Sequence, residues 1–341
     1  MTIRENESLS RHTTFRVGGL ARFFVEVTTE EDLKEAVTFA ERRALPVFVL
    51  GGGSNVLVSD DGFSGVVIHM ATRGIETNEV SANVAEVMAS SGEEWDAVVA
   101  WTVERGLHGL ENLSLIPGTV GAAVAGNIGA YGAELKDTLL WAESLDQRTG
   151  LVRRFSRGEC EFGYRRSFFK TSEGRNFVIT RAAFALNQRG PLNTQYKDVR
   201  DRLAAQNITA PTLAQVREAV IAIRRCKLPD LSRIGTAGSF FKNPLIPHAE
   251  YEALAARYPG LPGHDEGNSL VKVPLGWVLD KVCGLKGIRR GRVGTHSEQA
   301  LVIVNEGGTA AEVEAFATEL ARTVKEKTGM DIEWEVEKVG G

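Results

Sequence analysis

The chain has 341 residues, of which 43% are hydrophobic and 25% are charged, as in an ordinary folded protein of two or three domains. Its 40 basic and 44 acidic residues give a formal net charge of -4, which argues against a general nucleic-acid-binding protein. No apolar segment follows the N-terminal residues, so no secretory signal is expected. The three cysteines lie far apart, and the histidines lack metal-ligand spacing. We therefore expect a reduced, cytoplasmic protein without a metal.

Residues 22–70 are predicted to form a compact α/β unit. Thr28 and Glu31 have the spacing of a helix capping box, and the apolar residues that follow recur at helical spacing. Strands are expected at 23–27, 46–50, 56–58 and 65–68.

The run Gly51–Asn55 follows a strand and precedes another strand. A dinucleotide fingerprint of the Rossmann type must open a helix, and a P-loop needs Gly-Lys-Ser/Thr, so both are excluded. Two interpretations stay open. The run is either a nest of backbone amides that binds phosphate or a plain glycine turn, and the turn explains it at least as well.

Residues 71–218 are predicted to mix short strands with one clear helix, which Trp95, Val98, Val99 and Thr102 mark. The helix is followed by a second glycine run, Pro117–Gly132, inside a segment, 112–133, that carries no charge. Its glycines, proline and asparagines argue against a membrane span. Gly and Ala leave room for a large, flat, polar ligand, so this run predicts a dinucleotide held by backbone amides.

Residues 219–328 are predicted to form a separate α/β unit. Its leading helix ends before Pro229, and Thr309 with Glu312 caps a long last helix that Gly329 terminates. The tail 332–337 alternates apolar and acidic residues, which predicts a strand that completes the sheet of the N-terminal domain.

Five motifs then stand in order along the chain. They are Gly51–Asn55, Pro117–Gly132, Phe162–Lys170, Gly238–Pro244 and Glu335–Val336. In this order, and over nearly the whole chain, they resemble the UDP-N-acetylenolpyruvoylglucosamine reductase (MurB) family in its type I form. The segment 194–199 resembles the loop that places the type I tyrosine over the substrate.

The resemblance implies an α+β fold. It consists of a two-part FAD-binding fold of the vanillyl-alcohol-oxidase/PCMH type and a separate α/β substrate-binding domain. The implied parts are residues 1–70 with 329–341, residues 71–218, and residues 219–328.

The resemblance also implies an enzyme, a UDP-N-acetylmuramate dehydrogenase. With FAD as cofactor and NADPH as co-substrate, it reduces UDP-N-acetylglucosamine enolpyruvate to UDP-N-acetylmuramate for peptidoglycan synthesis. Its partners would be these small molecules alone, without nucleic acid or membrane, and the protein is expected to be a monomer. The alternatives are another FAD-dependent oxidoreductase of the same fold and a non-catalytic sugar-nucleotide-binding protein.

Three catalytic residues are implied by the family match. Ser239 would protonate the substrate carbon, and Arg165 with a protonated Glu335 would stabilise the negative charge that develops there. From the residues alone, a serine that closes a local turn is the more usual interpretation of Ser239. Glu335 also fits a solvated strand face. Arg165 also fits a surface basic patch with Arg153, Arg154, Arg157 and Arg166.

The remaining site residues also come from the family match. The implied cofactor-binding residues are Gly51, Gly52, Gly53, Ser54, Asn55, Pro117, Gly118, Thr119, Gly121, Ala122, Asn127, Gly129, Ala130 and Tyr131. The implied substrate-binding residues are Tyr164, Tyr196, Lys227, Asn243, Lys286 and Gln299. Ordinary exposed lysines explain Lys227 and Lys286 as well. No third-domain tyrosine over the nucleotide can be matched; Tyr258 and His264 are candidates.

Overall fold

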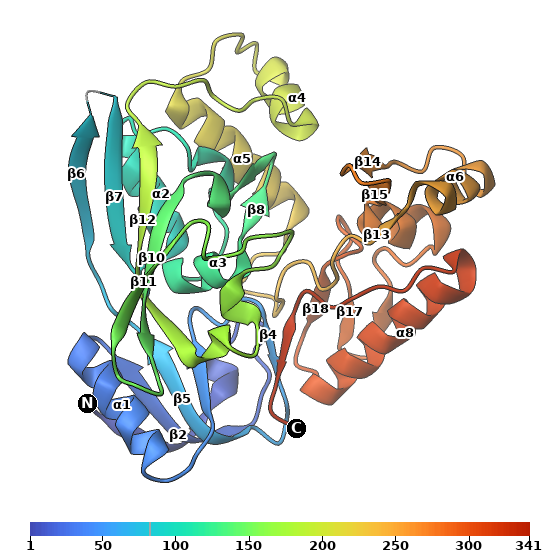
Figure 1. Ribbon diagram of the computed structural model, residues 1–341. Helices are drawn as coiled ribbons and strands as arrows, with labels where there is room; N and C mark the ends of the chain where they lie inside the picture. The colour runs from blue at the N-terminus through green and yellow to red at the C-terminus, as the bar shows by residue number, and fades with distance from the viewer. Residues whose placement is uncertain (82) are drawn as a thin grey trace. The chain divides into compact units, whose positions relative to one another are not determined.

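A computed structural model describes residues 1–81 and 83–341 of the chain. The chain divides into two compact units (Figure 1). Unit 1 comprises residues 1–7, 21–52 and 64–225, and unit 2 comprises residues 8–20, 53–63 and 226–341. The division of the chain into three domains stays a prediction.

Unit 1 contains a four-stranded sheet covered by helix α1 (Glu30–Glu41) (Figure 1). Its strand order is β1 (Ile3–Ser8), β2 (Leu20–Val27), β5 (Phe63–Met70) and β3 (Val47–Leu50), and β3 runs parallel to β5. The apolar side chains predicted for α1 are buried against this sheet.

The capping box of α1 was predicted one residue too early: Thr29 and Asp32 form it, not Thr28 and Glu31. Thr29 is the N-cap, and its hydroxyl accepts a hydrogen bond from the Asp32 N–H at 3.1 Å. The carboxylate of Asp32 accepts hydrogen bonds from the Thr28 hydroxyl and from the Thr29 N–H. Two adjacent threonines can each serve as a cap, and the extended backbone at Thr29 decides between them.

A five-stranded antiparallel sheet forms the larger part of unit 1 (Figure 1). Its order is β11 (Val152–Ser156), β10 (Leu139–Asp146), β12 (Phe177–Asn187), β7 (Val84–Ser90) and β6 (Ile75–Ser81). Helices α2 (Trp95–Glu104) and α3 (Val120–Gly126) pack on this sheet in one apolar cluster. All four residues that predicted α2 are buried.

Shorter elements complete unit 1. They are the pair β8 (Gly129–Ala130) and β9 (Ala133–Glu134), helices α4 (Lys197–Ala205) and α5 (Leu213–Lys227), and 3-10 turns at Glu111–Leu113, Leu135–Asp137, Phe168–Lys170 and Gly174–Asn176. The boundary with unit 2 falls inside the last turn of α5, after Arg225.

Unit 2 is built from short strands and helices around one core. One sheet has the order β13 (Leu245–Pro247), β15 (Leu270–Lys272) and β14 (His264–Asp265). A second has the order β16 (Arg289–Arg290), β17 (Val293–Thr295) and β18 (Ile303–Asn305). The third pairs β19 (Glu337–Val339) with β4 (Val56–Val58). The helices of unit 2 are α6 (His248–Arg257), α7 (Leu275–Trp277), a π-helical turn Val278–Val282 and α8 (Ala310–Thr328), with a 3-10 turn at Leu9–Arg11.

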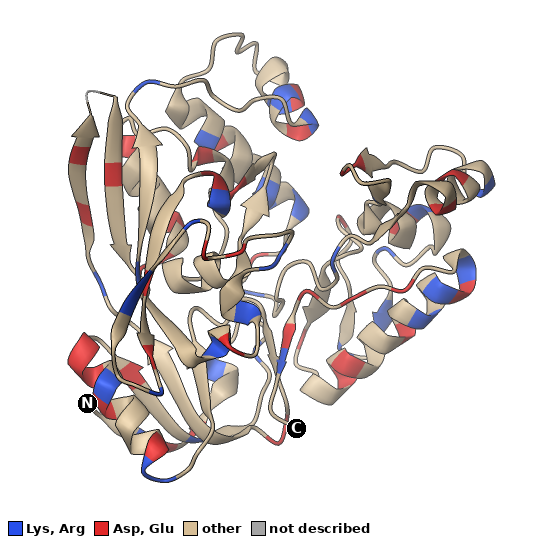
Figure 2. Ribbon diagram, viewed as in Figure 1, with Lys and Arg blue, Asp and Glu red and all other residues tan. Residues whose placement is uncertain are grey.

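The predicted ends of helix α8 are confirmed. Thr309 and Glu312 form the capping box, and Gly329 ends the helix in the left-handed conformation at φ 80°. The carboxylate of Asp60 also accepts hydrogen bonds from the Ala310 and Ala311 N–H groups, both at 2.9 Å. Acidic side chains lie mainly in the N-terminal half of this helix, and basic side chains lie in its C-terminal half (Figure 2).

The predicted strand at 332–337 was misplaced. Trp334 makes a single bridge to Phe241, and the strand begins only at Glu337, where it pairs in parallel with β4. The alternation has another cause. Trp334 and Val336 pack into the core of unit 2, and the Trp334 ring lies 4.8 Å from that of Phe240. In the part of the chain that is described, no helix has the length and apolar character that crossing a membrane requires.

Candidate active site

The two glycine-rich motifs contact each other in unit 1. A Cβ atom at Gly52 would lie 2.8 Å from the Cα atom of Gly118. A Cβ atom at Gly51 would lie 2.5 Å from the Thr119 hydroxyl oxygen and 3.1 Å from the Ala122 Cβ atom. The small residues of these motifs were expected to make room for a ligand. At Gly51 and Gly52 the chain itself makes this close approach.

Thr119 gives an independent test of whether a ligand belongs here. It is the N-cap of α3 and is 7% exposed, but its side chain makes no capping hydrogen bond. Among the described residues, its hydroxyl has no hydrogen-bond partner. A buried, unpaired hydroxyl costs about 1–3 kcal/mol, which a hydrogen bond to a bound group would recover. Thr119 therefore fits the FAD that the resemblance implies.

The close packing at Gly52 gives the first prediction. Gly52→Ala is expected to destabilise the protein by about 1–3 kcal/mol and to reduce the FAD that co-purifies, because its Cβ meets backbone that cannot rotate away. Gly158→Ala is the control, since nothing lies within 4 Å of its Cβ. Thermal unfolding and bound-flavin absorbance measure both effects. If the two variants behave alike, the packing argument is wrong.

In unit 2, residues 53–55 are bound to the C-terminal tail. Gly53 has a left-handed backbone, and its carbonyl accepts a hydrogen bond from the Thr14 N–H at 3.0 Å. The Asn55 amide donates to the Glu335 carbonyl at 3.0 Å, and the Asn55 carbonyl accepts from the Glu337 N–H at 3.0 Å. The Asn55 side chain therefore positions the backbone of Glu335, a role that the sequence did not reveal.

Arg165 lies in a tight turn beside the central glycine run. The turn is closed by two hydrogen bonds between Gly163 and Arg166, and Arg165 has a left-handed φ of 53°. Its Nη2 donates to the Gly129 carbonyl at 2.9 Å, and its guanidinium lies 5.4 Å from the centre of the Tyr164 ring. A non-glycine residue in this conformation is typical of functional sites.

Asn127 connects this turn to the glycine run. It is fully buried, and its amide donates to the Gly163 carbonyl at 2.9 Å and to Glu134 at 3.1 Å. Its own oxygen accepts from the Lys136 N–H at 3.1 Å. The side chain thus holds the two motifs together within unit 1. Its contact with a cofactor stays a prediction.

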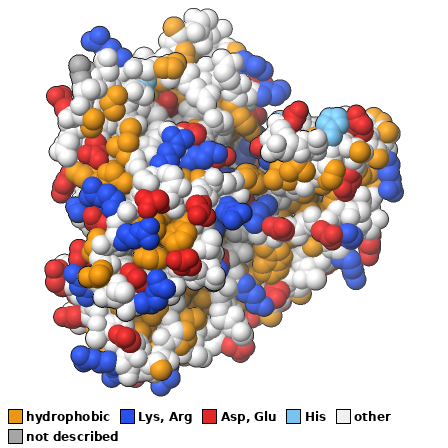
Figure 3. Space-filling model, viewed as in Figure 1, with side chains coloured by type: hydrophobic (Ala, Val, Ile, Leu, Met, Phe, Trp, Pro, Cys, Tyr) orange, Lys and Arg blue, Asp and Glu red, His pale blue; other side chains and the backbone are white. Residues whose placement is uncertain are grey.

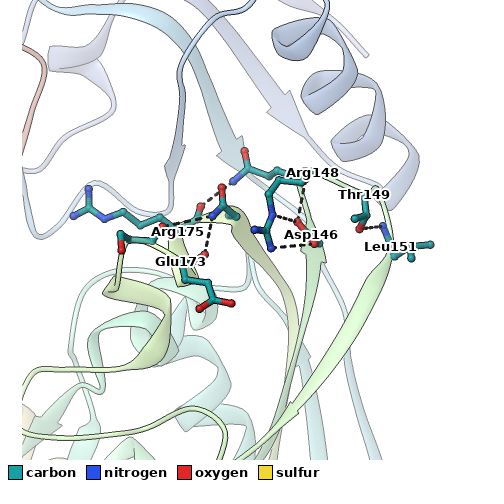
Figure 4. A network of polar contacts seen from close by, with 9 residues as sticks. Asp146, Arg148, Thr149, Leu151, Glu173 and Arg175 are labelled. Atoms are coloured by element: carbon teal, nitrogen blue, oxygen red, sulfur yellow. Dashed lines mark hydrogen bonds and ion pairs between the residues drawn. The ribbon is translucent and has the colours of Figure 1, made fainter.

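The arginines of β11 have acidic and aromatic partners. Arg153 pairs with Glu159 at 2.9 Å and lies over Phe155, and Arg154 pairs with Glu143 and lies over Trp141. In the neighbouring turn Asp146 pairs with Arg148 (Figure 4). Basic and acidic side chains are interspersed on the face shown in Figure 3. Acidic partners therefore offset this basic patch.

Two tyrosines of the predicted site lie edge to face. The rings of Tyr131 and Tyr196 are 5.4 Å apart, and Tyr196, the N-cap of α4, is 45% exposed. Two asparagines hold their loops together. Asn112 donates to the carbonyls of Tyr131 and Asn193, and Asn193 donates to the Gly132 carbonyl at 2.9 Å. No sequence pattern indicated either asparagine, because both act across long stretches of chain.

Arg224 of α5 is a further residue that the sequence did not reveal. Its Nε donates to the Leu115 carbonyl at 3.2 Å. Burial lowers the pKa of Arg224, although the nearby Tyr131 phenol raises it in part. Burial likewise raises the pKa of Tyr131, against the effect of Arg224. A cation therefore stands at the edge of the tyrosine pair.

The segments that carry Ser239 and Glu335 are joined by a backbone hydrogen bond in unit 2. The Glu335 N–H donates to the Phe240 carbonyl at 2.8 Å, which places Glu335 beside the residue that follows Ser239. Gly238 has φ 73°, and its N–H donates to the Thr236 hydroxyl at 3.1 Å. Thr236, not Ser239, therefore closes this turn. Among the described residues, the Ser239 hydroxyl makes no hydrogen bond.

The predicted nucleotide-binding residues of unit 2 have protein partners. The Asn243 oxygen accepts from the Leu275 N–H at 2.9 Å, and Lys286 pairs with Asp280 at 3.0 Å. The hydrogen bond from Lys286 holds the pKa of Asp280 below its ordinary value. Lys227 is the last residue of α5. The Tyr258 hydroxyl donates to the Lys327 carbonyl at 2.6 Å.

Two parts of the chain match known protein families. Residues 21–156 match the model of an FAD-binding domain. Residues 230–339 match the model of the C-terminal domain of UDP-N-acetylenolpyruvoylglucosamine reductase.

Full-length relatives carry the same family name. The UDP-N-acetylenolpyruvoylglucosamine reductase of Pseudomonas aeruginosa is 44% identical over 334 residues, which cover 98% of each chain. That of Ralstonia nicotianae is 44% identical over 95% of this chain and 96% of its own. The crystal structure of MurB from Thermus caldophilus superposes with a TM-score of 0.69 at 27% identity, covering 99% of this chain and all of the other. The chain therefore belongs to the UDP-N-acetylenolpyruvoylglucosamine reductase family of FAD-binding oxidoreductases, as its five ordered motifs predicted.

Proposed function

We propose that this protein reduces UDP-N-acetylglucosamine enolpyruvate to UDP-N-acetylmuramate, with NADPH as electron donor. It would do so in the cytoplasm, as a monomer, in the synthesis of peptidoglycan precursors. One observation carries the proposal. The backbone of Glu335 is hydrogen-bonded to Phe240, the residue after Ser239, in a chain whose full-length relatives are named for this reductase. The FAD supplies hydride-transfer chemistry when it is bound.

Binding of the FAD is assigned to the paired glycine runs. The segments 51–52 and 117–122 present close-packed backbone with the buried Thr119 hydroxyl between them. Backbone amides in such turns bind phosphate oxygens. The group is therefore proposed to lie with its diphosphate against these segments.

Arg165 is proposed to bind the carboxylate of the enolpyruvyl group. A guanidinium donates to a carboxylate through two parallel N–H groups, and negative charge grows on this part of the substrate during reduction. The hydrogen bond to Gly129 and the Tyr164 ring hold the guanidinium before substrate arrives. Little side-chain entropy is then lost on binding.

Ser239 and Glu335 are proposed to complete the reduction. The double bond gains a hydride at its methylene carbon and a proton at the adjacent carbon. The Ser239 hydroxyl gives that proton and regains one from solvent. Glu335 is proposed to donate a hydrogen bond to the developing negative charge, which requires its protonated form. The Asn55 side-chain amide donates a hydrogen bond to the Glu335 carbonyl and so holds the Glu335 backbone in place.

The nucleotide end of the substrate is assigned to Lys286, Asn243 and Gln299. A lysine ammonium suits a diphosphate as a point charge, and side-chain amides donate to its oxygens. Lys227 and Tyr196 are proposed as further substrate-binding residues. In this proposal Asp280 holds Lys286 in place until the anion arrives.

A visible absorption spectrum of the purified protein tests the function. Flavin bands are expected to be present, to bleach when NADPH is added without oxygen, and to return when UDP-N-acetylglucosamine enolpyruvate follows. Bands that bleach but do not return with this substrate would indicate another flavin-dependent oxidoreductase. Bands that never bleach would indicate a non-catalytic binding protein.

A further inference from the structure

Two of the proposed substrate amides contact the same short turn of unit 2, at the start of α7. The Leu275 N–H donates to the Asn243 oxygen at 2.9 Å. The next residue, Gly276, lies directly under the end of the Gln299 side chain, and a Cβ atom there would stand 2.6 Å from the Gln299 oxygen. We propose that Gly276 is a positioning residue for Gln299.

The hydrogen bonds define how each amide is turned. The Gln299 oxygen accepts a hydrogen bond from the Leu301 N–H at 3.2 Å, just as the Asn243 oxygen accepts from Leu275. An amide whose oxygen is held by a backbone N–H offers its nitrogen as the donor. Both side chains therefore favour an acceptor, such as a diphosphate oxygen. This step rests on the function proposed above.

A glycine is needed at 276 for steric reasons alone. Its φ lies outside the left-handed region, so alanine fits the backbone without strain. Real Cβ atoms essentially never approach another atom within 3.0 Å, so the Gln299 oxygen must move away. This oxygen ends a flexible side chain, so the side chain rotates while the backbone stays. The hydrogen bond to Leu301 is then lost.

The Gly276→Ala variant should therefore separate binding from folding. We expect its KM for the enolpyruvyl substrate to rise about 10- to 100-fold, the scale of one hydrogen bond to a charged group. Its melting temperature, its bound FAD and the bleaching by NADPH should match those of Gly158→Ala. Calorimetric titration of the holoenzyme with UDP alone should show the same loss of affinity.

A double-mutant cycle tests the mechanism. Gln299→Ala is expected to raise KM as Gly276→Ala does. The double variant should have the same KM as Gln299→Ala, because the side chain that the new Cβ atom at position 276 would displace is already absent. Independent, multiplying effects of the two substitutions would overturn the inference. The inference would also be overturned if Gln299→Ala raises KM but Gly276→Ala leaves KM unchanged. That result would leave the proposed function intact. An unchanged KM in Gln299→Ala would overturn both the inference and the substrate role of Gln299.

Discussion

Replacing Ser239 with alanine is expected to slow the return of the flavin bands after substrate addition by on the order of 10² or more, the scale of general acid catalysis. Bleaching by NADPH should keep its wild-type rate, since that step needs no proton from Ser239. The fold should be intact, because Thr236 closes the turn around Gly238 and the substitution only removes an oxygen. Stopped-flow absorbance resolves the two steps separately.

Two further variants sharpen this test. Ser239→Cys keeps a proton donor of similar size and should recover part of the lost rate. Ser232→Ala removes an exposed serine of the preceding turn and should change neither step. If the two steps in Ser239→Ala match those in Ser232→Ala, another group supplies the proton.

The parts of the fold that the sequence predicted well depend on short stretches of chain. The capping box and terminal glycine of α8 each involve contacts within four residues, and the buried face of α2 follows from helical spacing. The tail 332–337 shows the limit of this reasoning. Alternation reports which side chains face the interior, but Val336 is buried and Trp334 partly buried in the core of unit 2, and not within a sheet.

The candidate site likewise contains residues that local sequence patterns indicate and residues that they do not. The motifs drew attention to Ser239, Arg165 and the glycine runs through the family resemblance, and the roles of these residues stay predictions. Asn112 and Asn193, by contrast, act on backbone carbonyls far along the chain, and no spacing marks them. The same holds for Gly276, whose need for a small residue arises from a side chain 23 positions away.

The ion pair between Asp96 of α2 and Arg217 of α5 holds the loop before the central glycine run. Two N–H groups of Arg217 bind the Asp96 carboxylate, at 2.6 and 3.0 Å, and Asp96 also accepts from the Leu115 N–H. Leu115 has a left-handed φ of 58°, and its carbonyl accepts from Arg224. Such strain persists only where surrounding contacts impose it, so these groups position Pro117 and the residues after it.

Asp96→Asn is therefore expected to destabilise unit 1 by about 3 kcal/mol, because it leaves the mostly buried Arg217 without its counter-charge. Bound FAD should fall as well, since the glycine run loses its support. The control is Asp201→Asn, which breaks an exposed, solvent-screened pair with Lys197 and should change the stability far less. Denaturant unfolding followed by flavin absorbance measures both, and equal losses in the two variants would contradict the proposed support.

The pH dependence of this pair has a defined sign. Burial raises the pKa of Asp96, but hydrogen bonds from Arg217 and Leu115 lower it by more, so it lies below its ordinary value of 3.8. A depressed folded-state pKa contributes stability above the unfolded value, and that contribution is lost as pH falls through the folded value. The stability difference between wild type and Asp96→Asn should therefore be full at neutral pH and shrink only below about pH 3.8. A difference that shrinks between pH 7 and pH 5 would assign the effect to another titrating group.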